Sequence, residues 1–85
     1  MNCLAMVDSG NYAYMLCNIL EKEGYHVEVV PIPCYIAKNG CGICLKFPEE
    51  YKEMVIRIGR DKKVPVREIY RIIPNTAKNK YERIY

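Results

Sequence analysis

Residues Pro33 to Phe47 have the sequence P-C-Y-I-A-K-N-G-C-G-I-C-L-K-F, and the rest of the chain is organised around them. Three of the five cysteines, Cys34, Cys41 and Cys44, fall within this segment. Cys41 and Cys44 form a Cys-x-x-Cys pair, and a glycine stands on each side of Cys41. Glycine accepts backbone conformations that are closed to other residues and leaves space for a partner to approach. The pattern therefore predicts an exposed turn that presents the Cys41 thiol.

The sequence on both sides of this turn alternates between strand and helix patterns. Apolar residues recur at steps of three and four in two segments, which indicates two helices that each bury one face. The expected elements are a strand over 3–8, a helix over 11–23, strands over 25–32 and 43–47, a helix from Pro48 to about Asp61 and a strand over 64–73. This order predicts an α+β ferredoxin-like fold, a split β-α-β (βαββαβ) sandwich with two helices on one face of an antiparallel sheet.

The expected domain organisation is a single ferredoxin-like domain over residues 1–74. Residues 75–85 are polar, basic and weakly periodic, so we expect a basic C-terminal tail or a short helix there. The apolar positions of the helices and of the second strand predict the core. Its expected members are Leu16, Leu20, Val27, Val29, Val55 and Ile58.

Composition restricts the classes of protein that fit. A chain of 85 residues with 51% hydrophobic residues is sufficient for one small packed core. No apolar run reaches the roughly 18 residues of a membrane span, and the N-terminal residues do not resemble a signal peptide. We therefore expect a cytoplasmic protein with no membrane partner. Thiols stay reduced in that compartment, so five cysteines indicate reactive or metal-binding sulfur rather than disulfides.

Cys41 is the leading candidate for a nucleophilic or sulfur-carrying residue. Lys38 and Lys46, together with His26, would lower its pKa and favour the reactive thiolate. Backbone N–H groups contributed by Gly40 and Gly42 could form a small anion-binding turn that stabilises a thiolate or a persulfide.

Cys44 and Cys34 are the secondary candidates. Cys44 could be a resolving thiol that forms a transient disulfide with Cys41, or an ordinary strand residue. Cys34 lies at the start of the loop and could be close to the site. Cys3 and Cys17 fall on predicted buried faces and are most simply core residues.

Three other kinds of function are less well supported by the sequence. Cys34, Cys41, Cys44 and His26 could supply four metal ligands, but a Cys-x-x-Cys without a second matched pair is a weak zinc signal, so we expect no metal and no cofactor. The eight tyrosines suggest base stacking, yet the third strand lacks the aromatic pattern of RNA-binding sheets, which argues against nucleic acid. A single histidine without an evident partner favours a carrier over a stand-alone enzyme.

The segment from Pro31 to Lys46 resembles the family of small domains described as selenium/sulfur (Se/S) carrier protein-like. The positions that match the family pattern are Pro33, Ile36, Ala37, Cys41, Gly42, Leu45 and Lys46, and the closing Glu68-Ile-Tyr-Arg-Ile is similar to the last strand of the family. The resemblance implies that Cys41 carries the sulfur or selenium. It also implies two partners, a donor enzyme such as a cysteine desulfurase and an acceptor protein.

The chain departs from that family at two cysteines. Family members often have an arginine at the position of Cys34 and commonly lack a second cysteine at the position of Cys44. This difference keeps a dithiol redox protein that uses Cys41 and Cys44 as an alternative. A non-enzymatic interaction module, with the tyrosines and the basic tail as its contact surface, is a second alternative, and a homodimer is a further one.

Overall fold

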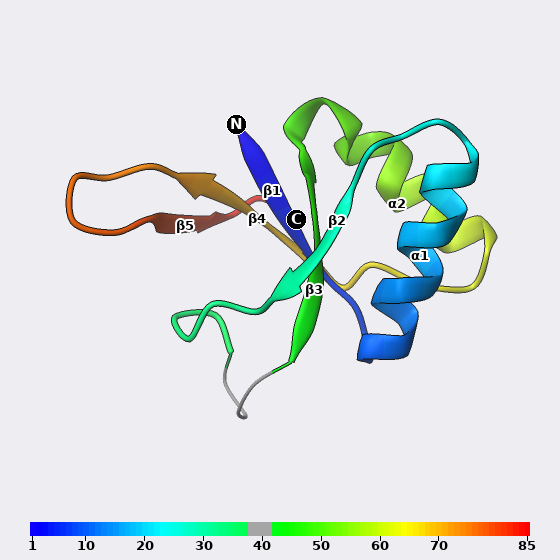
Figure 1. The fold of residues 1–85 in the computed structure, drawn as a ribbon, viewed down its shortest axis with the longest axis horizontal. Coiled ribbons are helices and arrows are strands. Elements are labelled where there is room, and N and C mark those ends of the chain that lie inside the picture. Colours follow the sequence, from blue (N-terminus) through cyan, green and yellow to red (C-terminus); the bar gives the residue numbers. More distant parts are fainter. Residues whose placement is uncertain (38–41) are drawn as a thin grey trace.

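Two helices pack on one face of a single antiparallel sheet (Figure 1). This computed structural model describes residues 1–37 and 42–85. Its elements are β1 (Asn2–Met6), α1 (Gly10–Lys22), β2 (Glu28–Pro31), β3 (Ile43–Pro48), the 3-10 turn η1 (Glu49–Tyr51), α2 (Lys52–Asp61), β4 (Glu68–Ile73) and β5 (Lys80–Arg83).

The sheet has the strand order β2-β3-β1-β4-β5, and every neighbouring pair is antiparallel. Ala5 in β1 stands opposite Leu45 of β3 on one side and Ile69 of β4 on the other. Strand β3 lies between β2 and β1, and β1 lies between β3 and β4, so two β-α-β units are interleaved. The structure thus confirms the predicted α+β class and its ferredoxin-like arrangement with both helices on one face.

Helix α1 begins and ends at the residues that its sequence favours. The Ser9 hydroxyl accepts a hydrogen bond from the Tyr12 N–H at 3.3 Å and caps the N-terminus. At the other end Gly24 adopts a φ of 91°, a conformation that costs glycine little. This bend lets the Tyr25 N–H donate to the Leu20 carbonyl oxygen at 2.9 Å, which satisfies the last turn of the helix.

The main core lies between the helices and the sheet. Leu16, Leu20, Val27 and Val55 are buried there, as predicted. Val29 and Ile58 are partly buried and pack against the same cluster. Strand residues of alternate parity, including Cys3, Ala5, Leu45, Phe47 and Ile69, supply the other side of this core.

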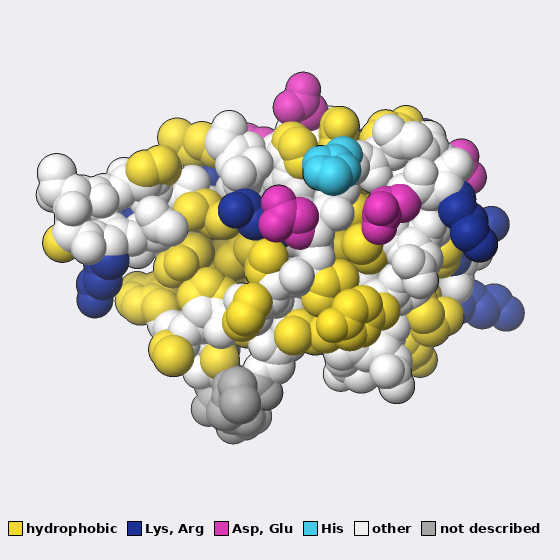
Figure 2. Space-filling model, viewed as in Figure 1, with side chains coloured by type: hydrophobic (Ala, Val, Ile, Leu, Met, Phe, Trp, Pro, Cys, Tyr) yellow, Lys and Arg dark blue, Asp and Glu magenta, His cyan; other side chains and the backbone are white. Residues whose placement is uncertain are grey.

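A second, smaller apolar cluster covers the opposite face of the sheet. Its buried members are Leu4, Met6, Ile36 and Cys44. Ile36 comes from the loop after β2, so that loop folds back over the sheet. Figure 2 shows hydrophobic side chains gathered beside the end of β2, toward the β4–β5 hairpin. The helix-free face is therefore largely apolar.

Residues 80–83 form the strand β5, where the sequence suggested a tail or a short helix. Tyr81 stands opposite Ile72 in the register of β4 and β5. Ile84 packs against the main core, and the Ile84 N–H donates to the Ile69 carbonyl oxygen at 2.8 Å. Backbone pairing with the edge of β4, rather than any helical pattern, decides the structure of this segment.

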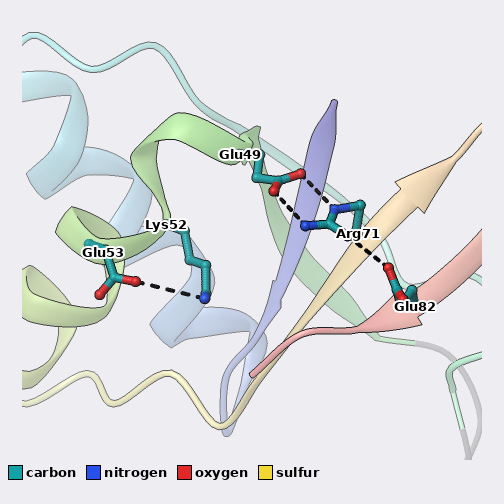
Figure 3. Close-up of polar contacts among 5 residues, drawn as sticks. All are labelled: Glu49, Lys52, Glu53, Arg71 and Glu82. Carbon is teal, nitrogen blue, oxygen red and sulfur yellow. Dashed lines mark hydrogen bonds and ion pairs between the residues drawn. The ribbon is translucent and has the colours of Figure 1, made fainter.

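Arg71 of β4 connects β5 with η1, the turn that follows β3 (Figure 3). Its guanidinium donates to both carboxylate oxygens of Glu49, at 2.7 and 2.6 Å, and to Glu82 of β5 at 2.8 Å. The hydrogen bonds from Arg71 hold the pKa of Glu49 below its usual range. One arginine thus connects η1, β4 and β5.

Candidate functional site

The predicted site lies at the end of the sheet where β2 leads into β3. The Ile32 N–H donates to the Gly42 carbonyl oxygen at 2.9 Å, so the hairpin pairing extends one step beyond both strands. Gly42 is exposed at this closure. Lys38, Gly40 and Cys41, which the sequence analysis placed in the site, lie outside the described residues.

The N-terminus of α1 lies at the same end of the sheet. A Cβ atom on Gly10 would lie 3.1 Å from the Cδ1 atom of Ile43, so the bare backbone of Gly10 allows the helix start to approach the start of β3. The first turn of α1 contains no acidic residue. A helix N-terminus carries a partial positive charge, and this end of the sheet therefore favours an anion.

Asp8, which precedes the cap of α1, is already paired. Its two carboxylate oxygens accept hydrogen bonds from Arg67, each at 2.9 Å. This pairing holds the pKa of Asp8 below its usual range. The negative charge of Asp8 is thus engaged by Arg67 and offsets the field of the helix N-terminus less than a free carboxylate would.

Cys34 is exposed in a turn that follows β2. The Pro33 carbonyl oxygen accepts hydrogen bonds from the N–H groups of Ile36 and Ala37, at 2.9 and 3.0 Å. This turn buries Ile36 against the sheet while Cys34 stays in solvent. The Cys34 thiol is therefore accessible to a reactant.

Cys44 has the opposite environment. Its side chain is 0% exposed and lies in the cluster on the helix-free face, together with Leu4, Met6 and Ile36. Burial raises the pKa of the Cys44 thiol to about 11. A thiol of this kind is mostly protonated near neutral pH, and the thiolate is the reactive form. Cys44 would have to leave this cluster before it could react with another thiol.

Cys3 and Cys17 are core residues, as predicted. Burial, with the help of a hydrogen bond from its Sγ atom to a Glu21 carboxylate oxygen at 3.2 Å, raises the pKa of Cys17 to about 11. Burial also raises the pKa of Cys3. Neither thiol is available to solvent.

The structure separates Lys46 and His26 from this end of the sheet. Lys46 stands opposite Glu28 and Leu4 in the ladder. It lies four residues from Gly42, about 13 Å along a strand. His26 is exposed before the start of β2, whereas the candidate loop follows its end. Within residues 1–37 and 42–85, no group of three or more histidine, cysteine or acidic side chains is placed to hold a metal ion.

A second group of exposed and partly exposed residues lies at the β4–β5 hairpin; the sequence offered the tyrosines and the basic tail only as a general contact surface and did not bring Tyr35 beside this segment. Tyr35, from the turn beside Cys34, stacks on Tyr81 of β5, with ring centroids 6.2 Å apart and an interplanar angle of 29°. Lys78 and Lys80 lie beside them and line the same pocket. The only signal in the sequence was the alternation of Lys80, Tyr81 and Glu82 after a proline-terminated strand, which is short for a strand prediction.

The helices in the described part of the chain lack the length and apolar character needed to cross a membrane.

Comparison with known proteins gives one match. The model of the family described as "Putative Se/S carrier protein-like" matches residues 2–71. No curated protein and no solved structure matches the chain. The match extends from β1 into β4 and covers every element that frames the candidate loop. The chain therefore belongs to the Se/S carrier protein-like family.

Proposed function

We propose that this protein carries sulfur or selenium on Cys41, between a donor enzyme such as a cysteine desulfurase and an acceptor protein. In the loading step the Cys41 thiolate attacks the terminal sulfur of a persulfide on the donor. A new S–S bond forms at Cys41, the S–S bond of the donor breaks, and the donor cysteine leaves as a thiolate. The terminal sulfur atom is transferred from the donor to Cys41 without net oxidation or reduction. A selenium atom in the terminal position would follow the same path.

The observation that carries this proposal is the burial of three of the other four thiols in a member of the Se/S carrier protein-like family. Three of the four described cysteines, Cys3, Cys17 and Cys44, are buried, and burial raises the pKa of each. A carrier needs a thiol that two enzymes can reach in turn. Among the described cysteines only Cys34 is exposed, and it is not among the positions that resemble the family pattern, whereas Cys41 is. These facts favour Cys41 as the residue that carries the cargo.

The position of α1 supports the same assignment. The N-terminus of this helix lies beside the start of β3, two residues after Cys41 in the sequence. A helix N-terminus lowers the pKa of a nearby thiol and stabilises an anionic sulfur. A persulfide is also an anion near neutral pH, so the same end of the fold would favour the loaded state.

Burial of Cys44 favours the carrier over a dithiol redox protein. A resolving thiol must reach its partner, and the Cys44 side chain is buried in the cluster that Leu4, Met6 and Ile36 form on the helix-free face. A disulfide from Cys44 would require this cluster to open. The carrier needs no such opening, because a single exposed thiol is sufficient.

Intact-mass spectrometry after incubation with a cysteine desulfurase and free cysteine tests the proposal. We expect the wild-type protein to gain about 32 mass units, one sulfur atom, in a form that dithiothreitol removes. Cys41→Ser should abolish the gain. Cys34→Ser and Cys44→Ser should retain it.

Two results would contradict the carrier. One is loading of the Cys41→Ser variant to the wild-type extent. The other is a wild-type protein that loses two thiols on mild oxidation, with no added sulfur, through a change that Cys44→Ser prevents. The second result would support the dithiol alternative instead.

A further inference from the structure

A cavity of about 350 Å³ lies between the turn after β2 and the β4–β5 hairpin. Its lining residues are Tyr35, Lys78, Asn79, Lys80 and Tyr81. The volume is within the range of sites that hold small ligands. Two tyrosines, two lysines and one asparagine line it, and none of these described lining residues is acidic. The lining selects for a ligand that is both planar and anionic.

The tyrosine pair gives the cavity an open stacking surface. Tyr35 and Tyr81 are nearly parallel, with an interplanar angle of 29°. Tyr81 is partly buried and packs against the cluster on the helix-free face, so it forms the fixed member of the pair. Tyr35 is 80% exposed, the highest value among the exposed large hydrophobic side chains. An aromatic side chain held in solvent in this way can stack a second planar group.

The charges around the cavity are unbalanced in favour of anions. The two acids of this part of the sheet are engaged by arginines, Glu82 by Arg71 at 2.8 Å and Glu68 by Arg83 at 3.2 Å. Neither Lys78 nor Lys80 forms an ion pair with any residue in the described ranges. The Lys78 ammonium group thus remains available to a phosphate at the cavity.

We propose that this cavity binds a nucleotide unit, with its base on the Tyr35–Tyr81 pair and its phosphate at Lys78. The Asn79 amide can both donate and accept, so it can hydrogen-bond the edge of a base. The unit can come from a free nucleotide or from one position of a single-stranded nucleic acid, because both present the same base and phosphate. The expectation of no nucleic acid rested only on the lack of an aromatic pattern in the third strand. The two rings of this site come instead from a loop and from β5. The proposal is independent of the chemistry of Cys41.

NMR titration of the ¹⁵N-labelled full-length protein tests the proposal. The probes are AMP, adenosine, inorganic phosphate, O-phosphotyrosine and a single-stranded oligouridylate. We expect AMP to shift the amide signals of Lys78, Asn79, Lys80 and Tyr81, and to bind more tightly than adenosine or phosphate. Tighter binding of the oligouridylate, with a steeper salt dependence, would identify a nucleic acid strand as the source. Binding no tighter than that of AMP would identify a free nucleotide.

Matched variants connect the binding to the cavity. Tyr35→Ala should weaken AMP binding about fivefold to a hundredfold, the range for loss of one stacking contact. Because Tyr35 is exposed, this substitution should leave the fold intact. The variant Lys78→Ala should weaken AMP binding and leave adenosine binding unchanged. The controls are Tyr14→Ala, which removes another exposed tyrosine on α1, and Lys22→Ala, at the end of that helix; both should bind AMP as the wild type does.

Any of three outcomes would overturn the proposal. The first is the absence of shifts in the cavity residues with all nucleotide probes at millimolar concentration. The second is phosphate or O-phosphotyrosine binding as tightly as AMP, which would make the site a general anion site or a phosphopeptide site. The third is an equal loss of AMP binding in the Tyr14→Ala control.

Discussion

Because the pKa of its buried thiol is raised, Cys44 makes the free energy of unfolding depend on pH in the alkaline range. Its pKa is about 11 in the folded state, against an ordinary value of 9.0. Between these two values the unfolded chain has released the proton and the folded chain has kept it. The free energy of unfolding therefore falls as pH rises through this interval, and the contribution of Cys44 is fully present below pH 9.

We expect urea unfolding to show this loss directly. Cys44 should contribute about 2 to 3 kcal/mol of destabilisation between pH 9 and pH 11. Cys44→Ala should remove that part of the slope, although it lowers stability at pH 7 by leaving a small cavity. Cys34→Ala, at an exposed thiol, is the control and should keep the wild-type slope. Parallel curves for the wild type and Cys44→Ala would contradict the assignment.

At the scale of one element, the end of α2 shows a helix that terminates without the usual glycine. Lys63 adopts a φ of 62°, in the left-handed region that favours glycine. The Val64 N–H donates to the Gly59 carbonyl oxygen at 2.8 Å, and the Lys63 N–H donates to that of Arg60 at 3.2 Å. This pair of hydrogen bonds is the arrangement that normally places glycine at the position of Lys63.

Lys63→Gly should therefore stabilise the protein. Relief of the left-handed conformation is worth about 1 to 2 kcal/mol, and the greater freedom of glycine in the unfolded chain returns about 0.4 to 1 kcal/mol of that. We expect a net gain of about 0 to 1.6 kcal/mol in the free energy of unfolding. Lys62→Gly is the matched control, because Lys62 has a φ of −95° and should lose stability. A Lys63→Gly variant less stable than the wild type would contradict the argument.

Gly59 of the same helix has a packing role that the sequence does not reveal. In the sequence this glycine comes too early to end the helix, and in the structure it lies inside α2. A Cβ atom there would lie 2.7 Å from the Val64 carbonyl oxygen. The absence of a side chain at Gly59 allows the backbone at Val64 to pass close to the helix as the chain turns toward β4. A contact of this kind depends on tertiary structure and leaves no local signal.

The elements that the sequence predicted well are those with strong local signals. The apolar steps through Leu16 and Leu20 predict α1 from local sequence, and Ser9 and Gly24, which bound it in the structure, are residue types that favour helix ends. Strand β5 could not be predicted in the same way. Its side chains alternate over only four residues, and its pairing with β4 and the ion pair from Glu82 to Arg71 come from another part of the chain.

The features of the candidate site likewise differ in whether local sequence could predict them. Burial of Cys3 and Cys17 followed from their places in apolar patterns. The burial of Cys44 did not, because it depends on a loop that folds Ile36 over the helix-free face. The separation of Lys46 from Gly42, in contrast, follows from the extended conformation of β3, which the sequence did predict.

At the scale of the whole molecule, β5 is an addition to the matched domain. The family match ends at residue 71, whereas β5 covers Lys80–Arg83. Strands β1 to β4 with both helices already form the interleaved β-α-β units. β5 then covers the edge of β4, places Ile84 against the main core and completes the cavity at Tyr35.

We therefore expect a chain truncated after Pro74 to fold cooperatively but with lower stability. Loss of the partly buried Tyr81 and Ile84 should reduce the free energy of unfolding by about 2 to 4 kcal/mol. Urea unfolding followed by circular dichroism measures this change. Glu82→Gln in the full-length protein is the control: it removes only a partly exposed ion pair and should cost much less than the truncation. A truncated chain without cooperative unfolding would show that β5 belongs to the minimal fold, and one as stable as the wild type would show that β5 does not pack on it.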